Sequence, residues 1–135
     1  QITIAASLLP QEQAAYQAAF DRLKEGSYAR AAEAFREFLA TYPRSGYADN
    51  ARYWLGETHY VTRDLDAALA DFRKLVAEHP DSAKLTHALL KVGYIHDALG
   101  DDAEARRVLE ALIREHPDTT AARLAAERLA EMASE

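Results

Sequence analysis

The sequence predicts an all-α fold built from repeated helix pairs, and three observations lead to this prediction. Alanine, leucine, glutamate and arginine are abundant in a chain of 135 residues, and all four favour helix. Three prolines recur at a constant interval of 37 residues, at Pro43, Pro80 and Pro117. The apolar residues between them recur at helical spacing. With 49% hydrophobic and 28% charged residues, one globular domain is expected.

The interval of 37 residues relates whole segments and not the prolines alone. YPRSGYA at 42–48 corresponds to HPDSAKL at 79–85 and to HPDTTAA at 116–122. Phe35, Phe72 and Leu109 also correspond, in the middle of each apolar stripe. Each interval therefore predicts two amphipathic helices, called A and B below, which in the second interval cover about 47–61 and 65–79.

Side chains at the segment ends predict where the helices begin and end. Each repeated proline ends a B helix, because proline lacks an N–H and restricts the residue before it. A side-chain oxygen two residues later can cap the next helix, and glycine can end an A helix in left-handed conformation. An acidic capping box is expected before the last B helix. The residues concerned are Ser45, Ser82 and Thr119 as caps, Gly26 and Gly100 as helix ends, and Asp101 with Glu104 as the box.

Glycine inside two A helices needs a structural reason, because it costs about 0.5–1 kcal/mol relative to alanine. Gly56 and Gly93 occupy equivalent positions. We expect Phe72 and Leu109 of the paired B helices to press against them, so that a small residue permits close approach.

Repeated helix pairs with small, alanine, phenylalanine and proline markers are typical of tetratricopeptide repeats, here three residues longer than the usual 34. The expected fold is a right-handed superhelix of three repeats, followed by a capping helix that covers the last apolar face. The expected organisation is a flexible N-terminal tail over 1–10 and a repeat domain over 11–133. Its repeats cover about 11–45, 46–82 and 83–119, and the capping helix covers 120–133.

Composition and spacing argue against several kinds of chemistry. There is no cysteine, and His59 and His96 read as one structural position written twice, so neither a metal nor a cofactor is expected. No nucleophile lies beside a base in a recognisable pattern, so an enzyme is not expected. The net charge of −6 argues against nucleic acid as a partner, and no apolar run is long enough for membrane insertion.

A protein-binding face formed by the A helices is the favoured hypothesis, because stacked helix pairs place these helices on the concave side. Tyrosine combines apolar area with a polar group, as a peptide-binding groove requires. The alternative is that the tyrosines only cover neighbouring helices. Trp54, whose counterparts are Gln17 and Lys91, stays open between packing and partner contact. The candidate residues are Tyr16, Phe20, Asn50, Tyr53, Trp54, Glu57, Tyr60, His87, Tyr94 and Asp97.

The stretches NARYWLGETHY, KVGYIHDALGD and ARLAAERL, joined by Pro-x-Ser/Thr segments, resemble the C-terminal tetratricopeptide-repeat domain of the CpoB (YbgF) family of cell division coordinators. The resemblance covers about residues 11–133, and YWLGE is its most specific part. A weaker similarity extends to the outer-membrane lipoprotein subunit of the barrel-assembly machinery.

The resemblance implies a periplasmic protein of the Tol–Pal system that binds TolA and, in some bacteria, a bifunctional penicillin-binding protein. It would link peptidoglycan synthesis to outer-membrane constriction during cell division. Family members trimerise through an N-terminal coiled coil, whereas residues 1–10 carry no heptads, so a homotrimer is expected only where that coiled coil is present. The alternative is an adaptor for another envelope or cytoplasmic protein with no division role. Only Lys24 and Lys91 could form a basic clamp for a terminal carboxylate, which disfavours a receptor for chaperone tails.

Overall fold

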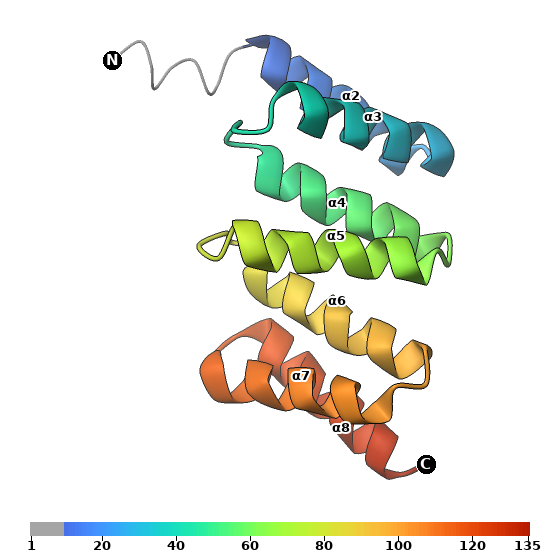
Figure 1. Cartoon of the computed structure of the whole chain (residues 1–135), viewed down its shortest axis with the longest axis vertical. Coiled ribbons are helices and arrows are strands. Elements are labelled where there is room, and N and C mark those ends of the chain that lie inside the picture. Colours follow the sequence, from blue (N-terminus) through green and yellow to red (C-terminus); the bar gives the residue numbers. More distant parts are fainter. Residues whose placement is uncertain (1–9) are drawn as a thin grey trace. The chain divides into compact units, whose positions relative to one another are not determined.

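The computed structural model describes residues 10–135, and this part of the chain contains seven α-helices and no strand (Figure 1). The predicted all-α class is confirmed. The expected tail falls on residues outside the described part except for Pro10, which begins the first helix. The helices are α2 (Pro10–Lys24), α3 (Tyr28–Thr41), α4 (Ala48–Val61), α5 (Leu65–Glu78), α6 (Leu85–Ala98), α7 (Asp102–Glu115) and α8 (Thr120–Ala133).

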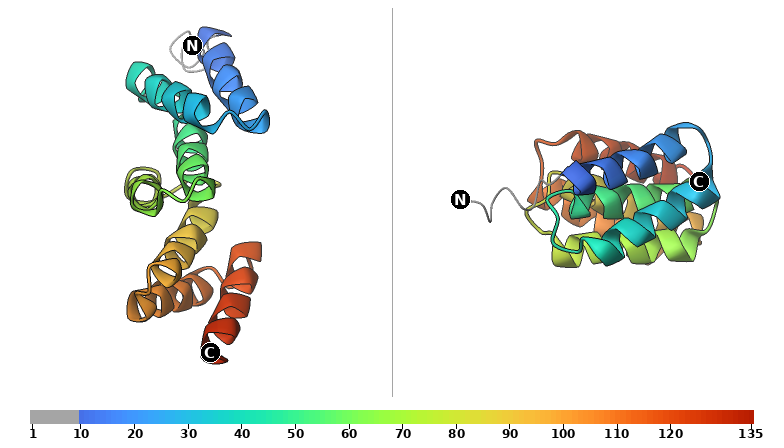
Figure 2. Two further views of the ribbon diagram at one scale, coloured as in Figure 1. Left: turned by 90° about the vertical axis from the view of Figure 1, so that its right-hand side faces the viewer. Right: turned by 90° about the horizontal axis from the view of Figure 1, so that it is seen from above.

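Two compact units, Gln1–Asp71 and Phe72–Glu135, make up the chain. In the first unit α2 and α3 form an antiparallel pair, and α4 contacts both (Figure 1). In the second unit α6 and α7 form an antiparallel pair, and α8 lies against both (Figure 2). α2, α4 and α6 are the predicted A helices and α3, α5 and α7 the B helices. The expected bounds of α4 and α5 are confirmed to within one residue.

Each unit has its own apolar core, contributed by the facing sides of its helices. Alanines at the helix crossings are completely buried and allow the larger side chains to interlock. The first core consists of Ala19, Ala31, Ala32, Phe35, Phe38, Ala51 and Leu55. The second consists of Leu90, Ala105, Leu109, Leu112, Ala121, Ala125 and Met132.

The predicted serine caps are wrong for two helices, and the predicted threonine cap is correct. Ser45 Oγ accepts from the backbone N–H of Tyr47 at 3.0 Å, and Ser82 Oγ accepts from that of Lys84 at 3.0 Å. Because α4 and α6 begin five residues after the proline, these serines stabilise the turn before the helix instead of capping it. α8 begins three residues after its proline, and there Thr119 Oγ1 accepts from the N–H of Ala122 at 3.1 Å.

In every repeat, the turn from helix A to helix B has a residue in the left-handed conformation at the same position. Gly26 (φ +81°) and Gly100 (φ +83°) hold it in the first and third repeats, as predicted. Arg63, 37 residues from each, holds it in the second with φ +67°. Since a left-handed conformation costs a non-glycine residue about 1–2 kcal/mol, the second turn is strained.

Arg63→Gly should therefore stabilise the protein, by about 0.5–1 kcal/mol after the greater chain entropy of glycine is subtracted. Urea unfolding followed by circular dichroism measures the change. Arg63→Ala is the matched control, because it removes the same side chain without relieving the backbone. Equal stability of the two variants would contradict the strain.

Gly93 lies under Leu109, as the sequence predicted. A Cβ atom placed on Gly93 would come within 2.4 Å of Leu109 Cδ2, far inside van der Waals contact. Leu109 itself is fully buried and has little room to shift. The glycine therefore sets how closely α6 and α7 approach.

Gly93→Ala should destabilise the protein by about 1–3 kcal/mol through overpacking, although alanine is the better helix former. A double-mutant cycle with Leu109→Ala tests the cause, using free energies of unfolding in urea. In the Leu109→Ala background the Gly93→Ala change should be neutral or stabilising. An unchanged penalty in that background would show that the two side chains do not clash.

Candidate protein-binding face of the A helices

The ten predicted binding residues divide between the two units. Seven lie on α2 and α4 in the first unit, namely Tyr16, Phe20, Asn50, Tyr53, Trp54, Glu57 and Tyr60. His87, Tyr94 and Asp97 lie on α6 in the second. His87 is exposed, Tyr53 is buried, and the other eight are partly buried.

Aromatic rings connect α2 to α4 in the first unit. Tyr16 and Phe20 stack at a centroid distance of 6.3 Å, and Trp54 meets Phe20 edge to face at 5.3 Å. Tyr47 stacks on Tyr16 at 5.0 Å. Sequence reasoning did not include Tyr47, although its place directly before α4 and beside an aromatic-rich helix was a usable signal. Offset and edge-to-face pairs of this kind each add about 0.5–1.5 kcal/mol beyond burial.

Trp54 has a packing role within the first unit. It lies against the first core, and its indole N–H donates a hydrogen bond to the Tyr16 phenol. Burial raises the pKa of Tyr16, and this hydrogen bond offsets part of that effect. Trp54 is only partly buried, so the same ring also reaches the surface.

The contact made by Trp54 recurs with different residue types in the second unit. Arg128 of α8 lies over the ring of Tyr94 at 3.9 Å, and its Nη1 donates to Asp97 Oδ2 at 3.0 Å. Trp54 and Phe20 are 34 residues apart, and so are Arg128 and Tyr94. The contact therefore recurs at equivalent repeat positions, although the residue types at these positions differ. Two predicted binding residues, Tyr94 and Asp97, hold the last helix in place.

Tyr53 contributes little accessible surface to the predicted face, because only 6% of it is exposed. Burial and the nearby carboxylate of Glu57 raise the pKa of the Tyr53 phenol to about 12. Asn50, Glu57 and Tyr60 are partly exposed on the same helix.

The repeated histidines make structural contacts. Arg36 Nη1 lies 3.5 Å from His59 Nε2, and Arg73 Nη2 lies 3.0 Å from His96 Nε2. His59 Nδ1 is also 2.7 Å from Asp71 Oδ2. An arginine donor at Nε2 assigns the ring proton to Nδ1 in both rings. Within residues 10–135 no three His, Asp or Glu side chains gather as metal ligands would.

Lys24, one of two candidates for a basic clamp, is already engaged inside the first unit. Its Nζ lies 3.5 Å from Asp21 Oδ1 and 5.4 Å from the centre of the Phe20 ring. Lys24 therefore already has an anionic and an aromatic neighbour within the unit. No helix in the described part of the chain combines the length and the apolar composition needed to cross a membrane.

The raised pKa of Tyr53 predicts a loss of stability in alkali. Above pH 10 the phenol ionises in the unfolded chain but stays neutral in the folded one, so the free energy of unfolding falls as pH rises towards 12. Between pH 9 and pH 11 the loss from this one group is about 1.4 kcal/mol. Urea unfolding at both pH values should show a smaller loss for Tyr53→Phe than for the unchanged chain. An identical loss in Tyr42→Phe and Tyr53→Phe would exclude this assignment.

Comparison with known proteins identifies relatives of two kinds. Two curated proteins from Pseudomonas putida, both named cell division coordinator CpoB, are 50% identical to this chain over 50 residues, which are 37% of this chain. The match spans only 19% of the length of those relatives. The resemblance to CpoB is thereby confirmed for this segment.

Solved structures with this fold are tetratricopeptide repeat domains. A tetratricopeptide repeat protein of Parabacteroides merdae is 17% identical with a TM-score of 0.72, over 82% of this chain and 42% of that one. The first such domain of Spaghetti (RPAP3), bound to an HSP90 peptide, is 16% identical with a TM-score of 0.73, over 92% and 94%. The Arabidopsis OM64 domain is 16% identical with a TM-score of 0.72, over 90% and 95%. At these identities the likeness establishes the fold.

A family profile covers all of the described residues. The family described as YfiO, outer membrane lipoprotein, matches residues 10–135. The motifs indicated only a weak similarity to the outer-membrane lipoprotein family, yet its profile matches residues 10–135. The match to CpoB covers 50 residues. The chain belongs to the YfiO outer membrane lipoprotein family.

Proposed function

We propose that this chain is a periplasmic protein-interaction module of the Tol–Pal system that binds TolA through its A helices. It would help to coordinate peptidoglycan synthesis with outer-membrane constriction during cell division. A bifunctional penicillin-binding protein is the second proposed partner. The observation that carries the proposal is the 50-residue match to proteins named cell division coordinator CpoB, on a tetratricopeptide fold.

The proposed TolA-binding residues are A-helix side chains that reach the surface. Phe20, Tyr53 and Trp54 interlock with neighbouring rings, and Tyr94 and Asp97 hold Arg128. Asn50, Tyr60 and His87 are accessible, in whole or in part. A polar and aromatic surface of this kind suits an extended or helical protein segment, with the buried aromatic rings beneath it keeping the backbone rigid.

A receptor for an acidic peptide tail is a less suitable function for this chain. The Spaghetti domain holds the HSP90 peptide SRMEEVD, whose last residues are acidic. Here Lys24 is engaged by Asp21 and Phe20, and the chain carries a net charge of −6. A carboxylate-rich tail would meet few free cations along these helices.

A second candidate is an adaptor for another envelope or cytoplasmic protein, without a role in division. The family match favours an envelope version of it, because the outer membrane lipoprotein profile spans residues 10–135 and CpoB identity spans 50 residues. An envelope location is common to this version and to the TolA proposal. The two differ in the partner.

The TolA proposal predicts that Tyr60→Ala combined with His87→Ala weakens binding of purified TolA by about tenfold or more, because accessible interface side chains carry the affinity. Isothermal titration calorimetry measures the change, and far-UV circular dichroism checks the fold. Arg114→Ala on α7 is the matched control, since its side chain is 70% exposed on a B helix.

Unchanged affinity in the double variant would overturn the proposed face. If the unaltered chain did not bind TolA but captured a protein from periplasmic extract lacking Tol proteins, the adaptor function would replace the division function.

A further inference from the structure

An arginine of one B helix meets the histidine of the next A helix at two places, and this contact is referred to below as the joint between repeats. Arg36 Nη1 of α3 lies 3.5 Å from His59 Nε2 of α4, and Arg73 Nη2 of α5 lies 3.0 Å from His96 Nε2 of α6. Both residues of the second pair stand 37 residues after those of the first. The surroundings of the two joints can therefore be compared position by position.

Beside the joint in the first unit, an ion pair connects α4 to α5. Arg52 Nη1 lies 3.3 Å from Asp71 Oδ1, and the side chains are only 19% and 11% exposed. The other carboxylate oxygen of Asp71 lies 2.7 Å from His59 Nδ1. At the second repeat, the long arginine side chain thus reaches across from the A helix to the B helix.

The third repeat also contains an ion pair, but at different positions. Leu89 and Val108 stand where the second repeat has its buried arginine and aspartate. The charges lie instead at Glu104 and Arg107, whose counterparts in the second repeat are both alanine. Arg107 Nε donates to Glu104 Oε1 at 3.0 Å, and the arginine side chain is 67% exposed. From the second repeat to the third, the ion pair therefore changes from a buried position to an exposed one.

An apolar hollow of about 190 Å³ lies at this place in the second unit, and it is named here the third-repeat hollow. Leu89 is shorter than arginine and uncharged, so it does not reach across as Arg52 does. The apolar lining comes from α5, α6 and α7, and the charged lining is Arg73 with the ion pair of α7. The apolar lining residues are Val76, Ala77, Leu89, Val92 and Val108.

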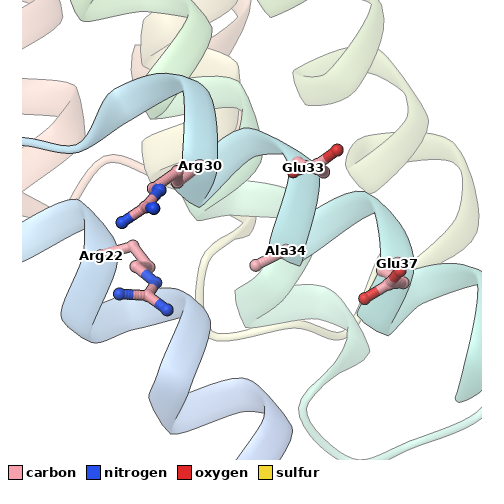
Figure 3. Close-up of a pocket in the computed structure, with 5 residues that line it drawn as sticks. All are labelled: Arg22, Arg30, Glu33, Ala34 and Glu37. Atoms are coloured by element: carbon pink, nitrogen blue, oxygen red, sulfur yellow. The ribbon is translucent and has the colours of Figure 1, made fainter.

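The charged residues at the third-repeat hollow select neither sign of charge. Glu104 and Arg107 pair with each other, and Arg73 contacts His96. A hollow in the first unit differs, because four of its five lining residues are charged (Figure 3). Those five are Arg22, Arg30, Glu33, Ala34 and Glu37. The aliphatic lining of the third-repeat hollow suits an apolar group instead.

The size of the third-repeat hollow limits what it can hold. An apolar cavity of about 150 Å³ can accommodate a benzene molecule, so about 190 Å³ is enough for one leucine or phenylalanine side chain. Water finds few hydrogen-bond partners against aliphatic side chains, so an apolar group that displaces it gains free energy. A side chain is also the kind of group that occupies the equivalent place in the second repeat, where Arg52 reaches Asp71.

We propose that the third-repeat hollow binds one leucine or phenylalanine side chain of a protein partner. An apolar floor with a polar rim is the arrangement found at the energetic centres of protein interfaces. None of the ten predicted A-helix binding residues lines this hollow, so the site is independent of TolA binding.

Three blocked pentapeptides test the preference for a large apolar side chain. The probes are Gly-Ser-Phe-Ser-Gly and the same peptide with leucine in the centre, and the control has alanine in the centre. Methyl NMR titration of the full chain should show saturable shifts at Val76, Val92 and Val108. The phenylalanine and leucine peptides should bind at least about tenfold more tightly than the alanine peptide, because they bury a larger apolar side chain.

A variant that fills the third-repeat hollow tests where the peptides bind. Ala77→Phe places a ring of the chain itself at the hollow and should weaken binding of the phenylalanine peptide by about tenfold or more. Ala77 is exposed, so circular dichroism should show an unchanged fold. Ala40→Phe is the matched control, because Ala40 is the equivalent exposed alanine 37 residues earlier, and it should leave the affinity unchanged.

A second variant closes the hollow in the way the second repeat does. Leu89→Arg combined with Val108→Asp introduces the ion pair that Arg52 and Asp71 form. This double variant should also lose binding of the phenylalanine peptide, while circular dichroism checks that the helices remain.

No saturable shift up to about 50 mM of the phenylalanine or leucine peptide would overturn the proposal. Equal affinity for the alanine peptide, or unchanged binding in Ala77→Phe, would also overturn it. Self-association in sedimentation that disappears in Ala77→Phe would assign the hollow to a second copy of the chain instead of a partner. Peptide binding that occurs only after removal of residues 1–9 would assign it to that segment.

Discussion

The close approach of paired helices at a small residue is the constraint on which the rest of this structure depends. Gly93 lets Leu109 reach the backbone of α6, and completely buried Ala19 occupies the equivalent position in the first unit. At that distance the B helix buries Phe35 in the first core and Leu109 in the second. Most of the other positions where the helices cross are alanines, which fill little space. The same helix pair can therefore be repeated along the chain with little change.

Tight packing also decides which A-helix side chains reach the surface. The contacts of Trp54 with Phe20 and of Arg128 with Tyr94 occupy equivalent repeat positions but use different side-chain types. In each, α4 or α8 packs on the A helix before it. Several residues that the sequence analysis assigned to the binding face therefore hold helices together. The accessible surface that remains is smaller and more polar than the aromatic composition indicates. Under the TolA proposal, the partner is recognised by shape and hydrogen bonds above a rigid aromatic layer.

The joint between repeats carries different side chains at equivalent positions. Inside the array the joint is an arginine against a histidine, with a carboxylate near each ring, and it is satisfied within the chain. At the first repeat the histidine position carries Arg22, which lines a hollow together with Arg30, Glu33 and Glu37.

The sequence by itself determined the helices, the repeat register, the left-handed turns at Gly26 and Gly100, and the close contact at Gly93, because these depend on local spacing and backbone conformation. It misplaced the caps at Ser45 and Ser82, because the same Pro-x-Ser pattern is compatible with two lengths of turn. Only the tertiary structure showed that Trp54, Tyr94 and Asp97 pack and that Tyr53 is buried, because these depend on side chains about 34 residues away or on helices that approach in space. Periodicity establishes which positions are equivalent, whereas the neighbours of each position decide what its side chain does.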